Sequence, residues 1–392
     1  MALVDIKDML NHAYAHGYAL GAFDLVSLDF LQGVICAAER ARAPVILSLA
    51  EPHFSHFDFE IMLPAVEAAA RRSAVPIAIQ LDHGTSRDSA VRAIRHGCNG
   101  VMLDVSHESL GENIRFTREV VEMAHACGIP VEGELGYVPG VEGEDAEHHP
   151  GELSYTTVAE ARGYVEKTGV DFLAVSIGTV HGRLKGKPRL DVQRLKQINE
   201  ALGIPLAVHG GSGLSDDQYH RLITHGVAKI NYYTALADIA GRCVYDNAAS
   251  DRSRGYTGLA KGVADAICAE VERCLRVWGS AGRAAEVMAQ CRPWLPVEHV
   301  IIYNVAESAV ADMAMVMAEG RRRLAKIPGV REVMTGEAVR EDARYRYTWL
   351  VKFCHPAVID SYRDHPDHVA FANSLFRPIA GDRITIDYQC IE

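Results

Sequence analysis

The chain has 392 residues, a formal net charge of −11 and a composition that is 48% hydrophobic. This length exceeds what one hydrophobic core usually supports, so we expect two domains. The acidic balance and the lack of basic runs argue against a nucleic-acid-binding surface, although a local cluster can still bind an anionic substrate. Nine scattered cysteines without a CxxC pair, and no visible signal peptide or membrane-spanning run, favour a cytoplasmic protein.

Apolar runs of strand length alternate with amphipathic segments over the first 231 residues. Helical spacing of apolar residues predicts helices at 28–42, 59–72, 113–126, 158–167 and 216–225. The predicted strands are 18–23, 45–50, 77–81, 100–104, 130–135, 172–177, 206–209 and 228–231. Eight strands that alternate with helices favour a closed (β/α)8 TIM barrel, and an open doubly wound sheet is the structural alternative.

The pattern changes at residue 297. The segments that follow are strand 297–305, helix 307–326, strands 330–337 and 345–353, helix 357–376 and strand 383–390. This β-α-β-β-α-β order is typical of a ferredoxin-like α+β unit. Because Pro293 and Pro296 stiffen the segment before it, we expect a barrel domain over residues 1–290 and a second domain over 297–392.

The predicted strand at 77–81 runs directly into Asp82, His83 and Gly84. In parallel β/α proteins the carboxyl ends of strands surround the active site. Adjacent residues on an extended strand point to opposite faces, but the chain turns beside Gly84, so both side chains can reach one cavity. Our interpretation is that His83 holds a metal ion and Asp82 moves a proton.

Two further strand ends carry a histidine beside a glycine, His181 and His209. With His83 they give three imidazoles, the number that a catalytic zinc ion uses when one position stays open. Asp104 and Glu134 could offer oxygen ligands to a second cation. Each has a structural alternative as well: a hydrogen-bonded histidine, an ion pair for Glu134, or a helix cap for Asp104.

A glycine-rich run follows His209 and leads into the helix predicted to begin near Ser215. Its sequence is Gly210-Gly211-Ser212-Gly213. Backbone amides at such a turn and the positive end of the helix favour an anion, so we expect a phosphate site beside the metal. The long segments 137–155 and 181–189 follow strands five and six, and we expect them to act as lids or substrate clamps.

Taken in order, six motifs resemble the signature of the class II, zinc-dependent ketose-bisphosphate aldolases, which include fructose- and tagatose-bisphosphate aldolases. The motifs are Asp82-His83-Gly84, 101–104 with Ser106, 131–136, 177–182, 209–213, and 229–231 with Thr234. The resemblance covers about residues 1–288. It implies reversible cleavage of a phosphorylated ketose to dihydroxyacetone phosphate and an aldehyde.

The resemblance also implies a role for each matching residue. Zinc would be held by His83, His181 and His209, and Asp82 would be the proton donor and acceptor. Asp104 and Glu134 would form a secondary site for a second or monovalent cation, and Glu142 would exchange the proton on the ketose fragment. The positions implied to hold the ketose phosphate are Gly182, Gly210, Gly211, Ser212, Asn231 and Thr234.

The sequence departs from the family pattern where the substrate aldehyde is expected. Asp24 stands at a usual asparagine, and Ala50 stands at a usual serine and is followed by Glu51-Pro52-His53. Tyr233 replaces a small, aliphatic or acidic residue and would re-line the site for the aldehyde half. The identity of the aldehyde, its stereochemistry and the presence of a second phosphate therefore stay open.

The segment after residue 297 resembles the stress-responsive dimeric α/β-barrel domain. The matching stretches are 297–300, 327–330 and 362–368. Such domains pair sheet to sheet, so the resemblance implies a homodimer or a higher homo-oligomer. The alternative is that His299, His365 and His368 line a small-molecule site.

Three other functions stay open from the residues alone. The first is a metal-dependent hydrolase or isomerase on the same barrel. The second is a Schiff-base aldolase with Lys229 as the nucleophile. The third is a sugar-phosphate-binding protein without turnover.

Overall fold

The computed structural model describes residues 2–140, 144–146, 155–184 and 189–389. The chain divides into two compact units. The first comprises Met1–Ala90, Asn99–Val121 and Pro130–Pro293, and the second comprises Val91–Cys98, Glu122–Ile129 and Trp294–Glu392. Within the described residues, no helix is both long and apolar enough to cross a membrane.

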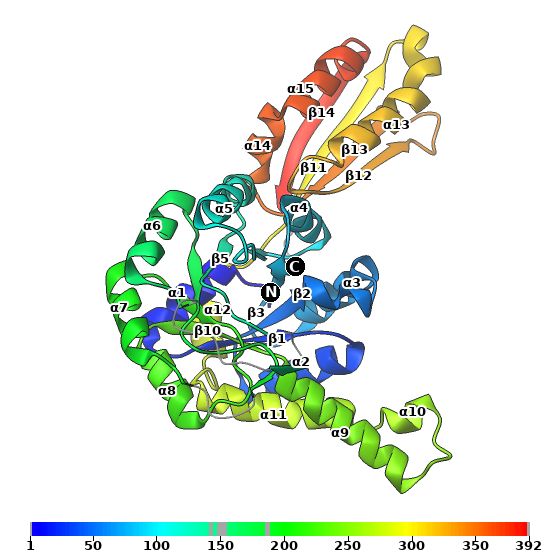
Figure 1. The fold of residues 1–392 in the computed structure, drawn as a ribbon. Helices are drawn as coiled ribbons and strands as arrows, with labels where there is room; N and C mark the ends of the chain where they lie inside the picture. Colours follow the sequence, from blue (N-terminus) through cyan, green and yellow to red (C-terminus); the bar gives the residue numbers. More distant parts are fainter. Residues whose placement is uncertain (1, 141–143, 147–154, 185–188, 390–392) are drawn as a thin grey trace. The chain divides into compact units, whose positions relative to one another are not determined.

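Eight parallel strands close into a barrel, which confirms the predicted (β/α)8 fold and rules out the open sheet (Figure 1). Their order around the barrel is β1-β10-β9-β7-β5-β4-β3-β2. The strands are β1 (Leu20–Asp24), β2 (Val45–Ala50), β3 (Ile77–Gly84), β4 (Gly100–Leu103), β5 (Val131–Leu135), β7 (Phe172–Val175), β9 (Leu206–Val208) and β10 (Val227–Tyr232). Every residue of these strands is buried, as expected for a parallel sheet that helices cover.

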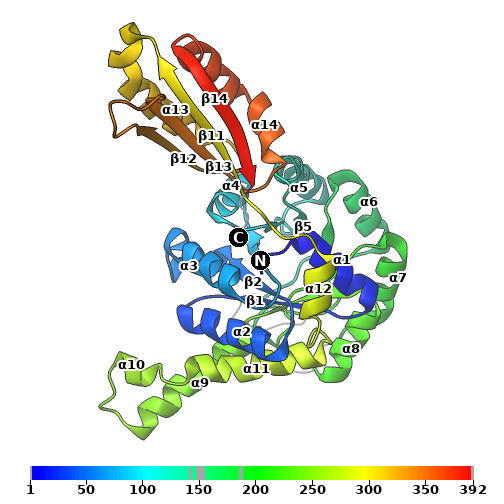
Figure 2. The same cartoon turned by 180° about the vertical axis from the view of Figure 1, so that it is seen from behind.

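Most of the helices pack around the outside of the barrel, although the first of them precedes β1 and the segment around residues 250–259 projects away from the barrel (Figures 1 and 2). They are α1 (Ile6–His16), α2 (Leu28–Ala41), α3 (Phe59–Arg72), α4 (Arg87–His96), α5 (Leu110–His125), α6 (Val158–Thr168), α7 (Val192–Leu202), α8 (Asp216–Thr224), α9 (Thr234–Ser250), α10 (Tyr256–Leu259), α11 (Val263–Val277) and α12 (Ala284–Gln290). Capping explains several starts: Thr157 and Ser215 form capping boxes at α6 and α8. All five predicted barrel helices are present, with ends that differ by at most three residues.

The two long loops after β5 and β7 are joined by backbone hydrogen bonds. Short strands β6 (Asp145–Ala146) and β8 (Arg183–Leu184) pair in parallel. The His181 amide also donates to the Pro139 carbonyl at 2.8 Å. The loops therefore support each other around His181, whereas Glu142 lies outside the described residues.

The C-terminal unit has an antiparallel sheet in the order β12-β13-β11-β14. The strands are β11 (Val297–Val305), β12 (Val330–Glu337), β13 (Tyr347–Phe353) and β14 (Ala380–Gln389), which confirms the predicted ferredoxin-like order. Its helices are α13 (Met313–Leu324), α14 (Val358–Asp364) and α15 (Pro366–Phe371).

Both predicted helices of this unit are interrupted. Residues 307–312 form a 3-10 helix rather than the first turns of α13. The helix predicted at 357–376 breaks at His365, because Pro366 disfavours helical backbone in the residue before it, and it ends in a π turn at Ala372–Phe376. Aromatic residues of these helices pack on Tyr303, Trp349 and Phe353, so one face of the sheet is covered.

Candidate active site

The end of β3 brings Asp82 and His83 into one cluster. His83 has a φ of 45°, in the left-handed region that residues other than glycine seldom adopt, and the register between β3 and β4 shifts between Leu81 and Gly84. As a result His83 Nε2 lies 3.9 Å from Asp82 Oδ2. The two adjacent side chains therefore share one cluster, as the turn beside Gly84 predicts.

His83, His181 and His209 offer ring nitrogens that all lie within 4.8 Å of one another. His83 Nε2 is 2.9 Å from His209 Nδ1. Buried His181 Nε2 has no hydrogen-bond partner among the described residues. Burial and the two neighbouring imidazoles lower the pKa of His181 well below its usual value, which favours the neutral form that binds metals.

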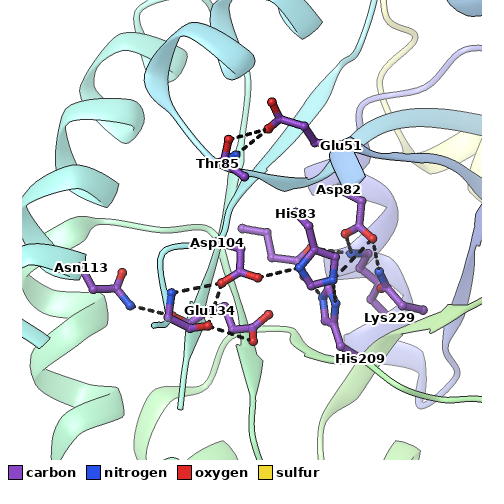
Figure 3. Close-up of polar contacts among 12 residues, drawn as sticks. Glu51, Asp82, His83, Thr85, Asp104, Asn113, Glu134, His209 and Lys229 are labelled. Carbon is purple, nitrogen blue, oxygen red and sulfur yellow. Dashed lines mark hydrogen bonds and ion pairs between the residues drawn. The ribbon is translucent and has the colours of Figure 1, made fainter. Parts of the chain in front are cut away.

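Two of these rings each contact a carboxylate, and Figure 3 shows the contact of His83 with Asp104. Asp104 Oδ2 lies 2.7 Å from His83 Nδ1, and Glu132 Oε1 lies 2.9 Å from His209 Nε2. Each ring thus uses one nitrogen for a carboxylate and presents the other to its neighbour. Carboxylate–histidine pairs of this kind fix ring orientation at metal sites, so the three histidines fit a zinc ion.

Glu132 is also paired with Lys229 inside the barrel. Lys229 Nζ lies 2.7 Å from Glu132 Oε2, and the Gln80 amide donates to the same oxygen at 2.8 Å. Burial alone would raise the pKa of Glu132, but the Lys229 ammonium and the His209 hydrogen bond hold that pKa well below its usual range. Glu132 is therefore an ionised carboxylate that orients His209.

Asp104 and Glu134 form a second potential cation group together with His83, again within 4.8 Å. Ser106 Oγ lies 2.7 Å from Asp104 Oδ1 and 3.4 Å from Glu134 Oε1. Glu134 Oε2 is buried without a hydrogen-bond partner among the described residues. Burial, together with the Asp104 charge, raises the pKa of Glu134 well above its usual value, so this position favours either a proton or a cation.

Asp82 is held by the end of β10. The Asn231 side-chain amide donates to Asp82 Oδ2 at 2.9 Å, and Lys229 Nζ lies 3.9 Å from Oδ1. Oδ1 is buried without a hydrogen bond from the described residues. Asn231, predicted to bind the ketose phosphate, therefore positions Asp82 in this structure.

The glycine-rich segment after β9 lies between two helix N-termini. Ser215 caps α8, and Ser212 Oγ accepts a hydrogen bond at 3.1 Å from the Ala235 amide in the first turn of α9, which begins at Thr234. Gly210 has a φ of 63°, and a Cβ there would lie 2.1 Å from the Val180 carbonyl oxygen. Gly182, with a φ of 81°, follows His181 on that neighbouring loop.

One backbone amide of this segment is already used within the protein. The Gly211 amide donates to the Asn231 carbonyl at 3.2 Å and is not directed at a ligand. The reason is close packing against β10, because a Cβ on Gly211 would lie 2.7 Å from that carbonyl oxygen. The N-termini of α8 and α9, which flank this segment, favour an anion there.

Glu132 has no role in the predictions from sequence, and its ion pair with Lys229 was not predicted. A signal was present, since Glu132 and Glu134 alternate on a buried strand and therefore point to the same face. His53 was also missed as a neighbour of Tyr233, with 4.4 Å between the ring centroids. No sequence signal predicts that contact.

Comparison with known proteins decides the family. The model of class-II fructose-bisphosphate aldolase matches residues 4–283. The chain belongs to the class-II fructose-bisphosphate aldolase family. It is therefore an aldolase, a carbon–carbon lyase, and its C-terminal part matches the stress responsive A/B barrel domain over residues 297–390.

Relatives of this aldolase align with the barrel. A fructose-bisphosphate aldolase of Geobacillus stearothermophilus is 38% identical over 294 residues, which are 73% of this chain and 100% of the relative. A probable fructose-bisphosphate aldolase of Bacillus subtilis (strain 168) is 37% identical over 291 residues, 72% of this chain and 100% of the relative. The crystal structure of the YdjI aldolase from Escherichia coli K12 superposes with a TM-score of 0.64 at 34% identity, covering 72% of this chain and 99% of that one.

Proposed function

We propose that this class II aldolase is zinc-dependent and reversibly cleaves a phosphorylated ketose to dihydroxyacetone phosphate and an aldehyde. The observation that carries the proposal is the convergence of His83, His181 and His209 beside Asp82. Zn²⁺ at these histidines would supply positive charge where the ketose oxygens become negative during carbon–carbon cleavage. A cytoplasmic location is part of the proposal, supported by nine cysteines without a CxxC pair.

In this proposal Asp82 is the group that moves the proton of the C4 hydroxyl. Its Oδ1 has no hydrogen-bond donor among the described residues and is open to a substrate hydroxyl, while Asn231 holds Oδ2. Asp82 accepts the C4 proton as the C3–C4 bond breaks and returns it during condensation. Glu142 keeps its predicted role in exchanging the proton on the ketose fragment.

The phosphate of the ketose binds where α8 and α9 begin. Support comes from Ser212 and Thr234, which lie at the N-terminus of α9, and from the close approach of Gly210 to the loop of Gly182. The aligned peptide dipoles of a helix favour an anion at this end. Asp104 and Glu134 serve as the secondary site for a second or monovalent cation.

The test is metal analysis combined with a coupled assay for dihydroxyacetone phosphate released from a panel of ketose phosphates. We expect bound zinc, activity that disappears on chelation, and recovery when zinc is added back. Magnesium added after chelation is the control, because it prefers oxygen ligands to imidazole. Bound zinc with no release of dihydroxyacetone phosphate from any ketose phosphate would contradict the proposal.

We also propose that the protein forms a homodimer through the C-terminal sheet. The strand face opposite the helices carries an apolar patch with Ile384, Ile386 and Tyr388 on β14, which are 39%, 41% and 51% exposed. On the neighbouring strand β11, Val300 pairs in register with Ile386, and Ile302 pairs with Ile384. An exposed apolar face of this kind suits burial against a second copy, as the domain resemblance implies.

The alternative of a small-molecule site has partial support. His368 lines a small cavity with Ile301, Trp349 and Phe371. His299 instead lies 2.7 Å from Asp387, and the His365 side chain caps α15. The three histidines therefore do not line one site.

A further inference from the structure

His53 and Tyr233 form an aromatic pair beside Asp82 that the proposed reaction does not use. His53 lies in the 3-10 helix Glu51–Ser55, directly after β2, whose last residue Ala50 pairs in register with Asp82. Tyr233 directly follows β10 and precedes α9. The ring centroids of His53 and Tyr233 are 4.4 Å apart, and the Phe30 ring lies 6.1 Å from that of Tyr233.

The imidazole of His53 carries an unused polar atom. His53 is 6% exposed, and its Nδ1 is buried without a hydrogen-bond partner among the described residues. A buried polar atom left without a hydrogen-bond partner is unfavourable, because it has lost its hydrogen bonds to water. Because His53 lies beside Asp82, a hydroxyl group of a bound substrate could form the missing hydrogen bond with Nδ1.

The charges around His53 do not suit a phosphate. Among the described residues, the titratable groups that act on it are Asp82, His56 and His83, and none is a lysine or an arginine. Burial lowers the pKa of His53 to about 4, despite the opposing effect of Asp82, so the ring is neutral near pH 7. A neutral imidazole and a phenol ring suit hydroxyl groups and C–H faces, whereas phosphates are bound by cations or helix N-termini.

Asp82 fixes which half of the substrate meets this pair. In the proposed reaction Asp82 takes the C4 hydroxyl proton, and the C4 oxygen becomes the carbonyl oxygen of the released aldehyde. The phosphate of the ketose lies at its proposed site around Ser212 and Thr234, a different group of residues from His53 and Tyr233. The side chains that adjoin Asp82 from β2 and β10 therefore face the aldehyde half.

We infer that His53 and Tyr233 bind the aldehyde half through its hydroxyl groups, and that this half is an uncharged hydroxyaldehyde, so that the ketose carries a single phosphate. This inference rests on the proposed function and deepens it. It also gives a reason for the departure of Tyr233 from the family pattern, since the ring packs on His53.

The experiment uses the zinc-loaded, full-length enzyme and two readouts. The first is condensation of dihydroxyacetone phosphate with glyceraldehyde or with glyceraldehyde 3-phosphate. The second is deuterium uptake by dihydroxyacetone phosphate in D₂O without an aldehyde. For the wild type we expect a kcat/KM for glyceraldehyde at least about tenfold above that for glyceraldehyde 3-phosphate, as one lost hydrogen bond or one unpaired charge predicts.

His53→Phe keeps the ring volume and removes the polar atom. We expect it to lower kcat/KM for glyceraldehyde about tenfold to a hundredfold and to leave deuterium uptake unchanged. His53→Asn, whose side chain can place a polar atom near that of Nδ1, should recover most of the loss. His220→Phe, the same substitution at an exposed position of α8, is the matched control and should leave both readouts unchanged.

The outcomes distinguish a failure of the inference about His53 and Tyr233 from a failure of the proposed function. A wild-type preference for glyceraldehyde 3-phosphate, with normal deuterium uptake, overturns the inference and leaves the proposed function standing. An equal loss of both readouts in folded His53→Phe also overturns it, because His53 would then act on the ketose half. No deuterium uptake and no condensation would overturn the proposed function, and the inference with it.

Discussion

Lys229 and Glu132 form an ion pair in the interior of the barrel, with 2.7 Å between Nζ and Oε2 and at most 1% of either side chain exposed. An amine must be unprotonated to attack a carbonyl, and this one is paired with an ionised carboxylate. Lys229 therefore serves to hold Glu132, which in turn holds His209. The arrangement disfavours the Schiff-base alternative that the position of Lys229 left open.

The first prediction concerns covalent trapping. Sodium borohydride added with dihydroxyacetone phosphate should leave the protein mass and activity unchanged, because the Lys229 amine is engaged. Intact-protein mass spectrometry measures this directly. A mass increase that maps to the Lys229 peptide, or activity that survives complete removal of metal, would contradict the assignment.

The second prediction concerns stability of the metal-free protein. Lys229→Met should lower the free energy of unfolding by about 3–5 kcal/mol, because it leaves Glu132 buried without a counter-charge. The double variant Lys229→Met with Glu132→Gln should lose less. Urea unfolding measures both, and Lys196→Met is the control, since Lys196 and its partner Glu200 are both about half exposed or more and the variant should change stability by at most about 1 kcal/mol. A single variant no worse than the double one would argue against the pair.

The third prediction separates proton transfer from metal binding. Asp82→Asn should lower kcat about a hundredfold to ten-thousandfold, because an amide cannot accept the C4 proton, while zinc content stays at the wild-type level. His181→Ala should instead lower zinc content, measured by elemental analysis after dialysis. Loss of zinc in the Asp82 variant would assign Asp82 to the metal rather than to the proton.

The fourth prediction is a pH dependence that originates at His53. Burial lowers its pKa in the folded protein from 6.5 to about 4, so the unfolded chain binds a proton first as the pH falls. The contribution of His53 to the free energy of unfolding is therefore fully present above pH 6.5, and it declines by about 3 kcal/mol as the pH falls to about 4. Metal-free His53→Asn should lose less stability than the wild type over this interval in urea unfolding. Parallel pH profiles for the two proteins would refute the assignment.

The fifth prediction concerns the C-terminal sheet. Ile384→Lys combined with Ile386→Lys should lower the molar mass in light scattering, because two charges would enter the proposed interface. Val339→Lys in the same domain is the control, since Val339 is fully exposed and lies outside the strands. An unchanged mass for the double variant would remove the sheet from the interface.

The sequence was sufficient for the barrel and the order of its strand ends. The barrel strands coincide with eight apolar runs in the sequence, and the glycines beside His83, His181 and His209 lie where these strands or the loops after them turn. Both features depend on short stretches of sequence and can therefore be predicted from it. The helix break at Pro366 also has a local cause. It was not predicted, because apolar residues keep their helical spacing on both sides of the proline. Strand existence was therefore predicted more accurately than helix continuity.

Contacts between side chains on distant strands could not be predicted. The pair of Glu132 with Lys229 joins β5 to β10, which are separated in the barrel by β7 and β9. The hydrogen bond from the Gly211 amide to the Asn231 carbonyl forms because the chain after β9 packs closely against β10. Such contacts depend on three-dimensional distance, which spacing along a chain does not encode.

The position of His53 has a consequence for how this enzyme can change over evolution. The proposed zinc ligands and Asp82 lie at the ends of barrel strands and of the loops that support them, whereas His53 belongs to a five-residue turn between β2 and α3. Replacing that turn would leave every hydrogen bond between barrel strands intact. If His53 selects the aldehyde as we propose, lineages and laboratory selection can exchange the preferred aldehyde by altering one short connection, while the residues that break the carbon–carbon bond are inherited unchanged.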